Sequence, residues 1–205
     1  MHKYTGYEAK AVVGGSDPLP AGGYIVKILG AKEEPWKNGG GSSLVISFDV
    51  SEGEYSGFFA EQFKANTNED KKWKGNLRVT IPDENSEYFD SQRKTFNSTI
   101  GAIEESNAGY HLDWGPVEKG DWSQLKGKQV GVLYRNKEWE YKGDTGWTTE
   151  AAYFSTTDYI HSGNVKIPKD KPLKNKQPVS TSGFASSASY GGFTEIVGED
   201  EHLPF

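Results

Sequence analysis

The feature that most constrains the fold is a strict alternation in residues 44–50. Every second side chain of this run is large and apolar: Leu44, Ile46, Phe48 and Val50. Successive side chains of a β-strand point to opposite faces of the sheet, so a period of two residues predicts a strand with one buried face. The chain is therefore expected to be organised around β-structure.

Four more strands are predicted from shorter patterns. They cover residues 24–29, residues 58–64, a stretch that begins with Val130, Val132 and Tyr134, and residues 150–155. Leu77, Val79 and Ile81 also alternate ahead of Pro82. The connections between the first two and the last two strands are predicted as a Gly-rich loop over residues 33–43 and a long hairpin over residues 135–148.

One helix is predicted between the third and fourth strands. Asp90 or Ser91 can cap its start, and Asn107-Ala108-Gly109 ends it. Its apolar stripe at helical spacing consists of Phe96, Ile100 and Ile103. Three strands, a helix and two strands is the strand order of the OB-fold. The expected fold class is mainly β: a five-stranded OB-fold barrel with one helix between strands 3 and 4, plus a flexible C-terminal tail.

Composition divides the chain into three parts. Residues 1–161 hold 18 Lys and Arg against 24 Asp and Glu, residues 162–193 hold five Lys against one Asp, and residues 194–205 hold four acids and no base. Periodicity stops at Gly163, where Lys, Pro, Ser and Gly predominate, as is typical of a linker. We predict a folded domain over 1–161, a flexible basic linker over 162–193 and an acidic tip over 194–205.

Composition also excludes several classes of protein. Cys is absent, so disulfides, thiolate catalysis and Cys-ligated metals are ruled out. No apolar run approaches the roughly 18 residues of a membrane span, and the N-terminus Met1-His2-Lys3-Tyr4 opens no signal peptide. The net charge of -6 counts against nonspecific adhesion to duplex DNA. We expect a soluble, cytoplasmic protein in which any nucleic-acid site is a local basic stripe.

Aromatic and cationic side chains gather in three segments. Single strands are bound by rings that stack on bases, at roughly 1–3 kcal/mol per base, and by cations that follow the phosphates. The first loop supplies Trp36 and Lys37, and the expected hairpin supplies Arg135, Lys137, Trp139, Tyr141, Lys142 and Trp147. The third segment supplies Phe63, Lys64, Lys71, Lys72, Trp73, Lys74 and Arg78. Together these are the predicted nucleic-acid-binding residues.

Aromatic residues can instead be core residues or loop anchors. We expect that role for Phe63, Trp114, Trp122 and Tyr134. By contrast, Trp36, Trp73 and Trp139 lie beside charged residues in Gly-rich or polar segments, so we expect them to be exposed for binding.

Signals of catalysis are weak. His111 and Asp113 could place two metal ligands near each other, but no other His has metal-binding spacing around it. Glu138 and Glu140 share a strand face without a third carboxylate to complete a nuclease-like site. The nucleophile elbow, the phosphate loop and the dinucleotide fingerprint are absent. We expect no enzymatic activity, no cofactor and no metal.

The chain ends in Glu199-Asp200-Glu201-His202-Leu203-Pro204-Phe205, three acids followed by an apolar stop. This segment suits a basic pocket with a hydrophobic floor on a partner. It resembles the acidic, Phe-terminated tip of bacterial and phage single-stranded-DNA-binding proteins, which docks replication and recombination enzymes and competes with DNA for the protein's own groove. The resemblance implies partner binding through Glu199, Asp200, Glu201, Leu203, Pro204 and Phe205.

The body of the chain is similar to phage-encoded single-stranded-DNA-binding proteins over most of residues 17–160. The segments that carry the similarity occur in order: Leu19-Pro20-Ala21-Gly22-Gly23-Tyr24, residues 42–50, Gly53-Glu54-Tyr55-Ser56-Gly57 and residues 125–132. The resemblance implies binding of single-stranded DNA with little sequence specificity during phage DNA replication, recombination and repair. It also implies recruitment of a helicase, polymerase, recombinase or nuclease by the tip, in the cytoplasm of a bacterial host.

Two other classes of function remain open. A carbohydrate-binding β-module also exposes Trp and Tyr on Gly-rich loops, but its binding would not depend on salt and its acidic tip would have no purpose. A phage structural or assembly protein would use the same aromatic residues as a subunit interface. Monomer, dimer and tetramer are all compatible with the sequence.

Overall fold

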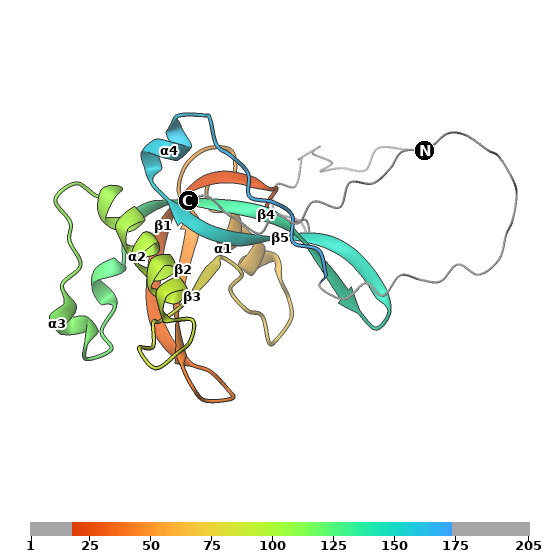
Figure 1. The fold of residues 1–205 in the computed structure, drawn as a ribbon. Coiled ribbons are helices and arrows are strands. Elements are labelled where there is room, and N and C mark those ends of the chain that lie inside the picture. Colours follow the sequence, from red (N-terminus) through yellow and green to blue (C-terminus); the bar gives the residue numbers. More distant parts are fainter. Residues whose placement is uncertain (1–17, 174–205) are drawn as a thin grey trace, which may run out of the picture. The chain divides into compact units, whose positions relative to one another are not determined.

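A computed structural model describes residues 18–173, and all elements named below lie in that range (Figure 1). The described residues form five strands: β1 (Gly22–Pro35), β2 (Ser42–Val50), β3 (Asn76–Thr80), β4 (Gln129–Tyr141) and β5 (Asp144–Ser155). Their helices are α1 (Phe58–Ala65), α2 (Phe89–Glu105), α3 (Trp114–Val117) and α4 (Thr157–His161), with a 3₁₀ turn at Ser123–Leu125. None of the helices in this range is long and apolar enough to cross a membrane.

The strands form one antiparallel sheet in the order β3-β2-β1-β4-β5. β1 is the central strand: it pairs with β2 over residues 26–35 and with β4 over residues 22–27. The predictions of a mainly β, five-stranded fold and of a helix between β3 and β4 are confirmed. Within residues 18–173 the outer strands β3 and β5 approach each other without pairing, so the sheet is open at that point rather than closed into a barrel.

The core lies on one face of this curved sheet and is covered by α2. The alternation in β2 predicts its buried face correctly, since Leu44, Ile46 and Phe48 are 0% exposed. The other strands contribute Val26, Ile28, Leu77, Val79, Val130 and Val132. The predicted stripe of α2, which consists of Phe96, Ile100 and Ile103, is buried against them. Because α2 packs against both β3 and β5, it spans one end of the gap between the outer strands.

The prediction of a third strand over residues 58–64 is wrong, because this segment is helix α1. The third strand is the alternating segment 76–80 instead. The helix starts beside β2, where the Asp49 carboxylate accepts hydrogen bonds from the backbone N–H groups of Phe59 (2.9 Å) and Ala60 (3.1 Å). Two otherwise unpaired N–H groups of the first turn are thereby satisfied, which favours a helix at this point.

The residues after α4 return to the sheet. Lys171 bridges to the free edge of β4: its N–H donates to the Asn136 carbonyl at 2.9 Å, and its carbonyl accepts from the Glu138 N–H at 3.0 Å. Upstream, the Val165 side chain lies against Gly23 of β1. Residues 165–171, which the sequence assigns to the linker, thus make specific contacts with the sheet.

Of the four predicted anchor residues, two are buried, Phe63 is half-buried and Trp114 is exposed. Trp122 and Tyr134 are 3% and 4% exposed, as predicted. Trp114 is 51% exposed and is therefore not a core residue; of the two roles expected for it, only that of a loop anchor remains. It lies at the start of the short helix α3, and its ring centroid lies 6.4 Å from that of Phe96.

Candidate nucleic-acid interface

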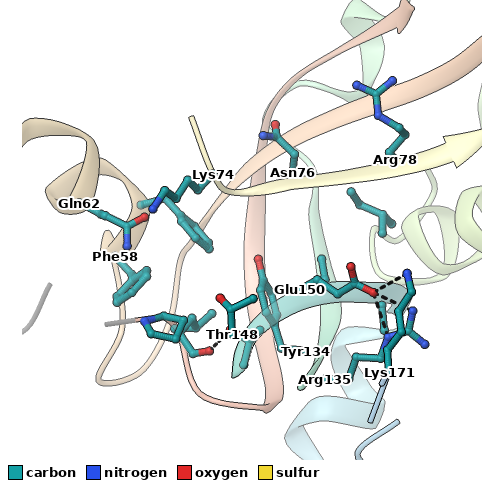
Figure 2. Close-up of a pocket in the computed structure, with 17 residues that line it drawn as sticks. Phe58, Gln62, Lys74, Asn76, Arg78, Tyr134, Arg135, Thr148, Glu150 and Lys171 are labelled. Carbon is teal, nitrogen blue, oxygen red and sulfur yellow. Dashed lines mark hydrogen bonds and ion pairs between the residues drawn. The ribbon is translucent and has the colours of Figure 1, made fainter. Parts of the chain in front are cut away.

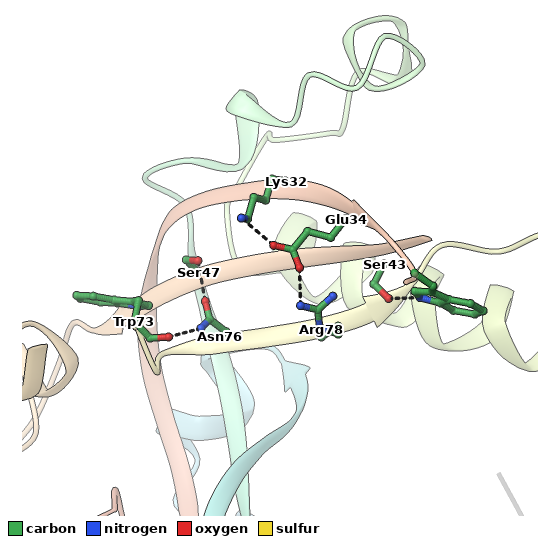
Figure 3. Close-up of polar contacts among 8 residues, drawn as sticks. Lys32, Glu34, Ser43, Ser47, Trp73, Asn76 and Arg78 are labelled. Atoms are coloured by element: carbon green, nitrogen blue, oxygen red, sulfur yellow. Dashed lines mark hydrogen bonds and ion pairs between the residues drawn. The ribbon is translucent and has the colours of Figure 1, made fainter. Parts of the chain in front are cut away.

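The outer face of β1-β2-β3 carries a small ion-pair network (Figure 3). Cross-strand pairing places Val45 between Lys32 of β1 and Arg78 of β3. Glu34 binds both cations, and its pKa is lowered by the hydrogen bond from Lys32 and by that from Arg78. Val45 is only 6% exposed although it points away from the core. The network therefore forms a polar cover over an apolar strand surface.

Two Trp residues lie near the ends of this outer face. The Trp36 indole N–H donates to the Ser43 hydroxyl at 2.7 Å, and the ring is 39% exposed. The Trp73 indole N–H, in contrast, donates to the carbonyls of Phe48 (3.0 Å) and Gly75 (3.1 Å), and its ring packs against the core. Because Ser43 and Phe48 are both on β2, the two indole anchors are separated by roughly 17 Å of strand.

The predicted basic segment between α1 and β3 gathers around Trp73. The ring centroid of Phe63 lies 5.8 Å from that of Trp73, and the Lys71 ammonium lies 4.6 Å from the Phe63 centroid. Trp73 is half-buried rather than free, so Phe63 and Trp73 form a supported aromatic surface. The side chains of Lys64, Lys72 and Lys74 are exposed nearby in the sequence.

The predicted hairpin is present, but most of its residues are strand rather than loop. β4 and β5 are paired up to Tyr141 and Asp144 around a tight turn in which Lys142 has φ 52 and Gly143 has φ 90. Arg135, Lys137, Trp139 and Tyr141 alternate along β4 and so share one face. Trp147 is paired with Glu138 and faces the opposite side. The structure therefore separates Trp147 from the other predicted hairpin residues.

Three cations converge on the Glu150 carboxylate at the base of the hairpin. Arg135 donates to it through Nε (3.1 Å) and Nη2 (2.8 Å), and the ammonium groups of Lys137 and Lys171 lie 2.9 and 3.1 Å from its oxygens. Burial alone would raise the pKa of Glu150, but the hydrogen bonds from Lys137, Arg135 and Lys171 outweigh it and lower the pKa to about 2. One carboxylate among three cations leaves a local excess of positive charge.

A pocket of about 540 Å³ lies in the gap between β3 and the β4–β5 hairpin (Figure 2). Its cations come from both sides: Lys74 and Arg78 from the β3 side, and Arg135 and Lys171 from the hairpin side. Its floor is apolar and consists of Leu19, Phe58, Phe59, Leu77 and Tyr134. Asn76 and Arg78 belong both to this pocket and to the outer face of the sheet, so the two surfaces are continuous.

The pocket brings together only part of the predicted site. Lys74, Arg78 and Arg135 line it, whereas the predicted aromatic residues do not. Four lining residues that matter were not predicted as binding residues: Gln62, Tyr134, Glu150 and Lys171. The pairing of Glu150 with Arg135 could have been predicted from the sequence. Both residues are equally far from the hairpin turn, and residues at equal distances from a turn face each other across the two strands.

Two other predictions concern the acidic tip and a possible metal site at His111 and Asp113. The acidic tip, Glu199 to Phe205, lies outside the described residues. His111 lies 3.8 Å from Glu104, and residues 18–173 contain no group of three or more metal-ligating side chains. No model of a protein family matches the chain, and no curated protein matches its sequence.

Proposed function

We propose that this protein binds single-stranded DNA with little sequence preference, through an OB-type fold whose gap between the third and fifth strands stays open. The proposal includes a role in phage DNA replication or recombination, with the acidic tip (199–205) recruiting partner enzymes. The observation that carries it is the pocket, where four cations from two sides of a gap meet in a chain whose net charge is -6.

The surfaces around the pocket supply what a single strand needs. Phosphates can compete with Glu150 for Arg135, Lys137 and Lys171, because a phosphodiester offers the same anionic oxygens as a carboxylate. Bases can stack on the exposed rings of Trp36 and Trp139, each of which is 39% exposed. Stacking and phosphate contacts are largely independent of base identity, which accounts for the proposed lack of sequence preference.

The test is quenching of Trp fluorescence by an oligothymidylate at about 50 and about 200 mM salt. If the four pocket cations each contact one phosphate, the affinity falls with salt with a slope of about -2.8, or about 50-fold between the two conditions. Duplex DNA of the same length should bind much more weakly, because its bases are not available for stacking. A salt-independent interaction, or equal binding of duplex, contradicts the proposal.

A pair of Lys variants localises the binding. Lys74→Gln removes an exposed cation that lines the pocket, and is expected to lower the affinity severalfold and reduce the salt slope by about 0.7. Lys94→Gln removes another exposed cation, from α2 and outside this pocket, and is expected to change neither. Equal effects of the two variants would mean that binding follows overall charge and not this groove.

A further inference from the structure

The pocket between β3 and the hairpin contains polar groups that nothing in the described chain satisfies. Tyr134 is the clearest case. It is 4% exposed, yet its hydroxyl makes no hydrogen bond with any residue of 18–173. Nor is the hydroxyl sealed off, since the fully enclosed unpartnered atoms among these residues belong to Tyr110 and Trp122. A hydroxyl that opens into a pocket from an otherwise buried ring is available to hydrogen-bond a ligand there.

Two further hydrogen-bonding groups border the same space. The side-chain amide of Gln62 on α1 and the hydroxyl of Thr148 on β5 make no hydrogen bond within the described part of the chain. The Lys74 ammonium makes no ion pair with these residues either. Asn76, by contrast, is engaged with Ser47 and with the Trp73 carbonyl. The free groups therefore come from opposite sides of the gap, as Figure 2 shows for Gln62 and Thr148.

The floor beneath these groups is aromatic. The rings of Phe59 and Tyr134 are stacked with their centroids 6.3 Å apart, and Phe58 meets Phe59 edge to face at 5.2 Å. A tyrosine phenol is protonated and able to donate at neutral pH, and burial raises the pKa of Tyr134 further. The volume of about 540 Å³ lies within the range of small-molecule sites.

We infer that this pocket holds one nucleotide, unstacked from the bound strand. The base lies on the rings of Phe58, Phe59 and Tyr134 and forms hydrogen bonds with Gln62, Thr148 and the Tyr134 hydroxyl. Its phosphate binds the cations that line the pocket, Lys74, Arg78, Arg135 and Lys171. An aromatic floor, free hydrogen-bonding groups and nearby cations together favour a ligand in which a planar aromatic group is joined to an anion. The inference rests on the proposed function, and it adds one discrete site to a surface that otherwise binds bases without distinction.

The test uses the full-length, ¹⁵N-labelled protein, titrated with each of the four deoxynucleoside 5′-monophosphates and, separately, with inorganic phosphate. The nucleotides are expected to give saturable shifts of the amide signals in residues 58–62, 74–78 and 148–151. Inorganic phosphate is expected to shift only signals near the rim cations, at lower affinity. Identical shifts and affinities for phosphate and nucleotides would show an anion site with no place for a base, and would overturn the inference.

Tyr134→Phe removes only the unpartnered hydroxyl, so the fold should be retained. It is expected to weaken nucleotide binding about threefold to tenfold, the loss of one hydrogen bond. Tyr153→Phe, an exposed tyrosine on β5 outside this pocket, is the matched control and should bind as the parent does. Unchanged binding by Tyr134→Phe, or an equal loss in both variants, overturns the assignment.

Binding of oligothymidylate by the same preparations separates the two proposals. If the oligomer binds but nucleotides give no shifts in the pocket, the nucleotide site is wrong and strand binding stands. If nucleotides bind in the pocket but the oligomer does not bind at all, strand binding is wrong and the pocket is a site for free nucleotides.

Discussion

At the scale of single residues, Glu150 has the most unusual environment in the candidate interface. Its two carboxylate oxygens are shared among Arg135, Lys137 and Lys171, which come from β4 and from the segment after α4. The carboxylate thus links β5 to β4 and to the segment after α4. Its pKa, lowered to about 2, means that this link persists until the solution is strongly acidic.

We predict that Glu150 stabilises the fold in a pH-dependent way. A carboxyl group whose folded pKa is depressed contributes stability above its unfolded pKa and loses it as the pH falls toward the folded value. Since the group is partly exposed and therefore screened, the contribution is about 1 kcal/mol. Urea unfolding should show Glu150→Gln less stable than the parent by about that amount at pH 7, with the difference shrinking between about pH 4.5 and pH 2.

The matched control is Glu105→Gln, which removes an exposed carboxylate at the end of α2. Its unfolding free energy should match that of the parent throughout this range. A Glu150→Gln difference that stays constant with pH would show that the substitution acts by packing and not by charge.

At the scale of elements, α1 depends on a cap supplied from another element. Asp49 on β2 accepts the N–H groups of Phe59 and Ala60, while the residue before the helix, Gly57, provides no side chain to do so. Asp49→Ala is therefore expected to lower the free energy of unfolding by about 1 kcal/mol. Denaturant unfolding measures this loss.

Asp90→Ala serves as the comparison for the α1 cap. Asp90 lies in the first turn of α2, is exposed, and pairs with Arg93. Its loss should cost less than about 0.5 kcal/mol. If both variants lose the same free energy of unfolding, the Asp49 hydrogen bonds do not stabilise α1 more than an ordinary surface ion pair would.

The dependence on Asp49 also explains which elements the sequence could predict. The alternation in residues 44–50 and the stripe of α2 are periodic, and periodicity reflects a face buried along the whole element. The segment Phe58–Ala65 is only 8 residues long and starts with two adjacent Phe, which suits a strand as well as a helix. The residue whose contacts favour a helix, Asp49, lies nine residues before the start of α1. The local sequence pattern of Phe58–Ala65 therefore contains no sign of it.

The candidate site was predictable only in its charged parts. Lys74, Arg78 and Arg135 could be predicted because a cation in a polar segment is a candidate for phosphate binding whatever its position in the fold. Gln62 and Tyr134 become site residues only because β3 and β5 pass each other without pairing. That gap is a property of the assembled sheet, and a Tyr in an alternating strand is otherwise a core residue.

At the scale of the whole molecule, the contacts of residues 165–173 extend the part of the chain that packs on the sheet beyond the predicted boundary at residue 161. Val165 lies against Gly23, Lys171 pairs with β4, and the Leu173 N–H donates to the Glu138 carboxylate at 3.2 Å. We predict that a chain ending at Leu173 unfolds at the same urea concentration as the full-length protein. A chain ending at Ser162 should be less stable by at least about 1 kcal/mol, because it loses these backbone hydrogen bonds.

The same two chains test the contribution of Lys171 to the interface. The chain ending at Ser162 should also bind oligothymidylate with a smaller salt slope, since one pocket cation is gone. Equal stability and equal salt slope in both truncated chains would show that residues 163–173 contribute neither to the stability of the fold nor to DNA binding.

Among residues 18–173, the facing edges of β3 and β5 are unpaired, and this has a consequence for the behaviour of the protein in a crowded cell. A strand margin with unused backbone donors and acceptors is a template for any other extended chain, including another copy of the same protein. An occupant of the gap would block that approach. Under the proposed function, a bound single strand would cover these strand edges and so protect the protein from associating with other copies of itself.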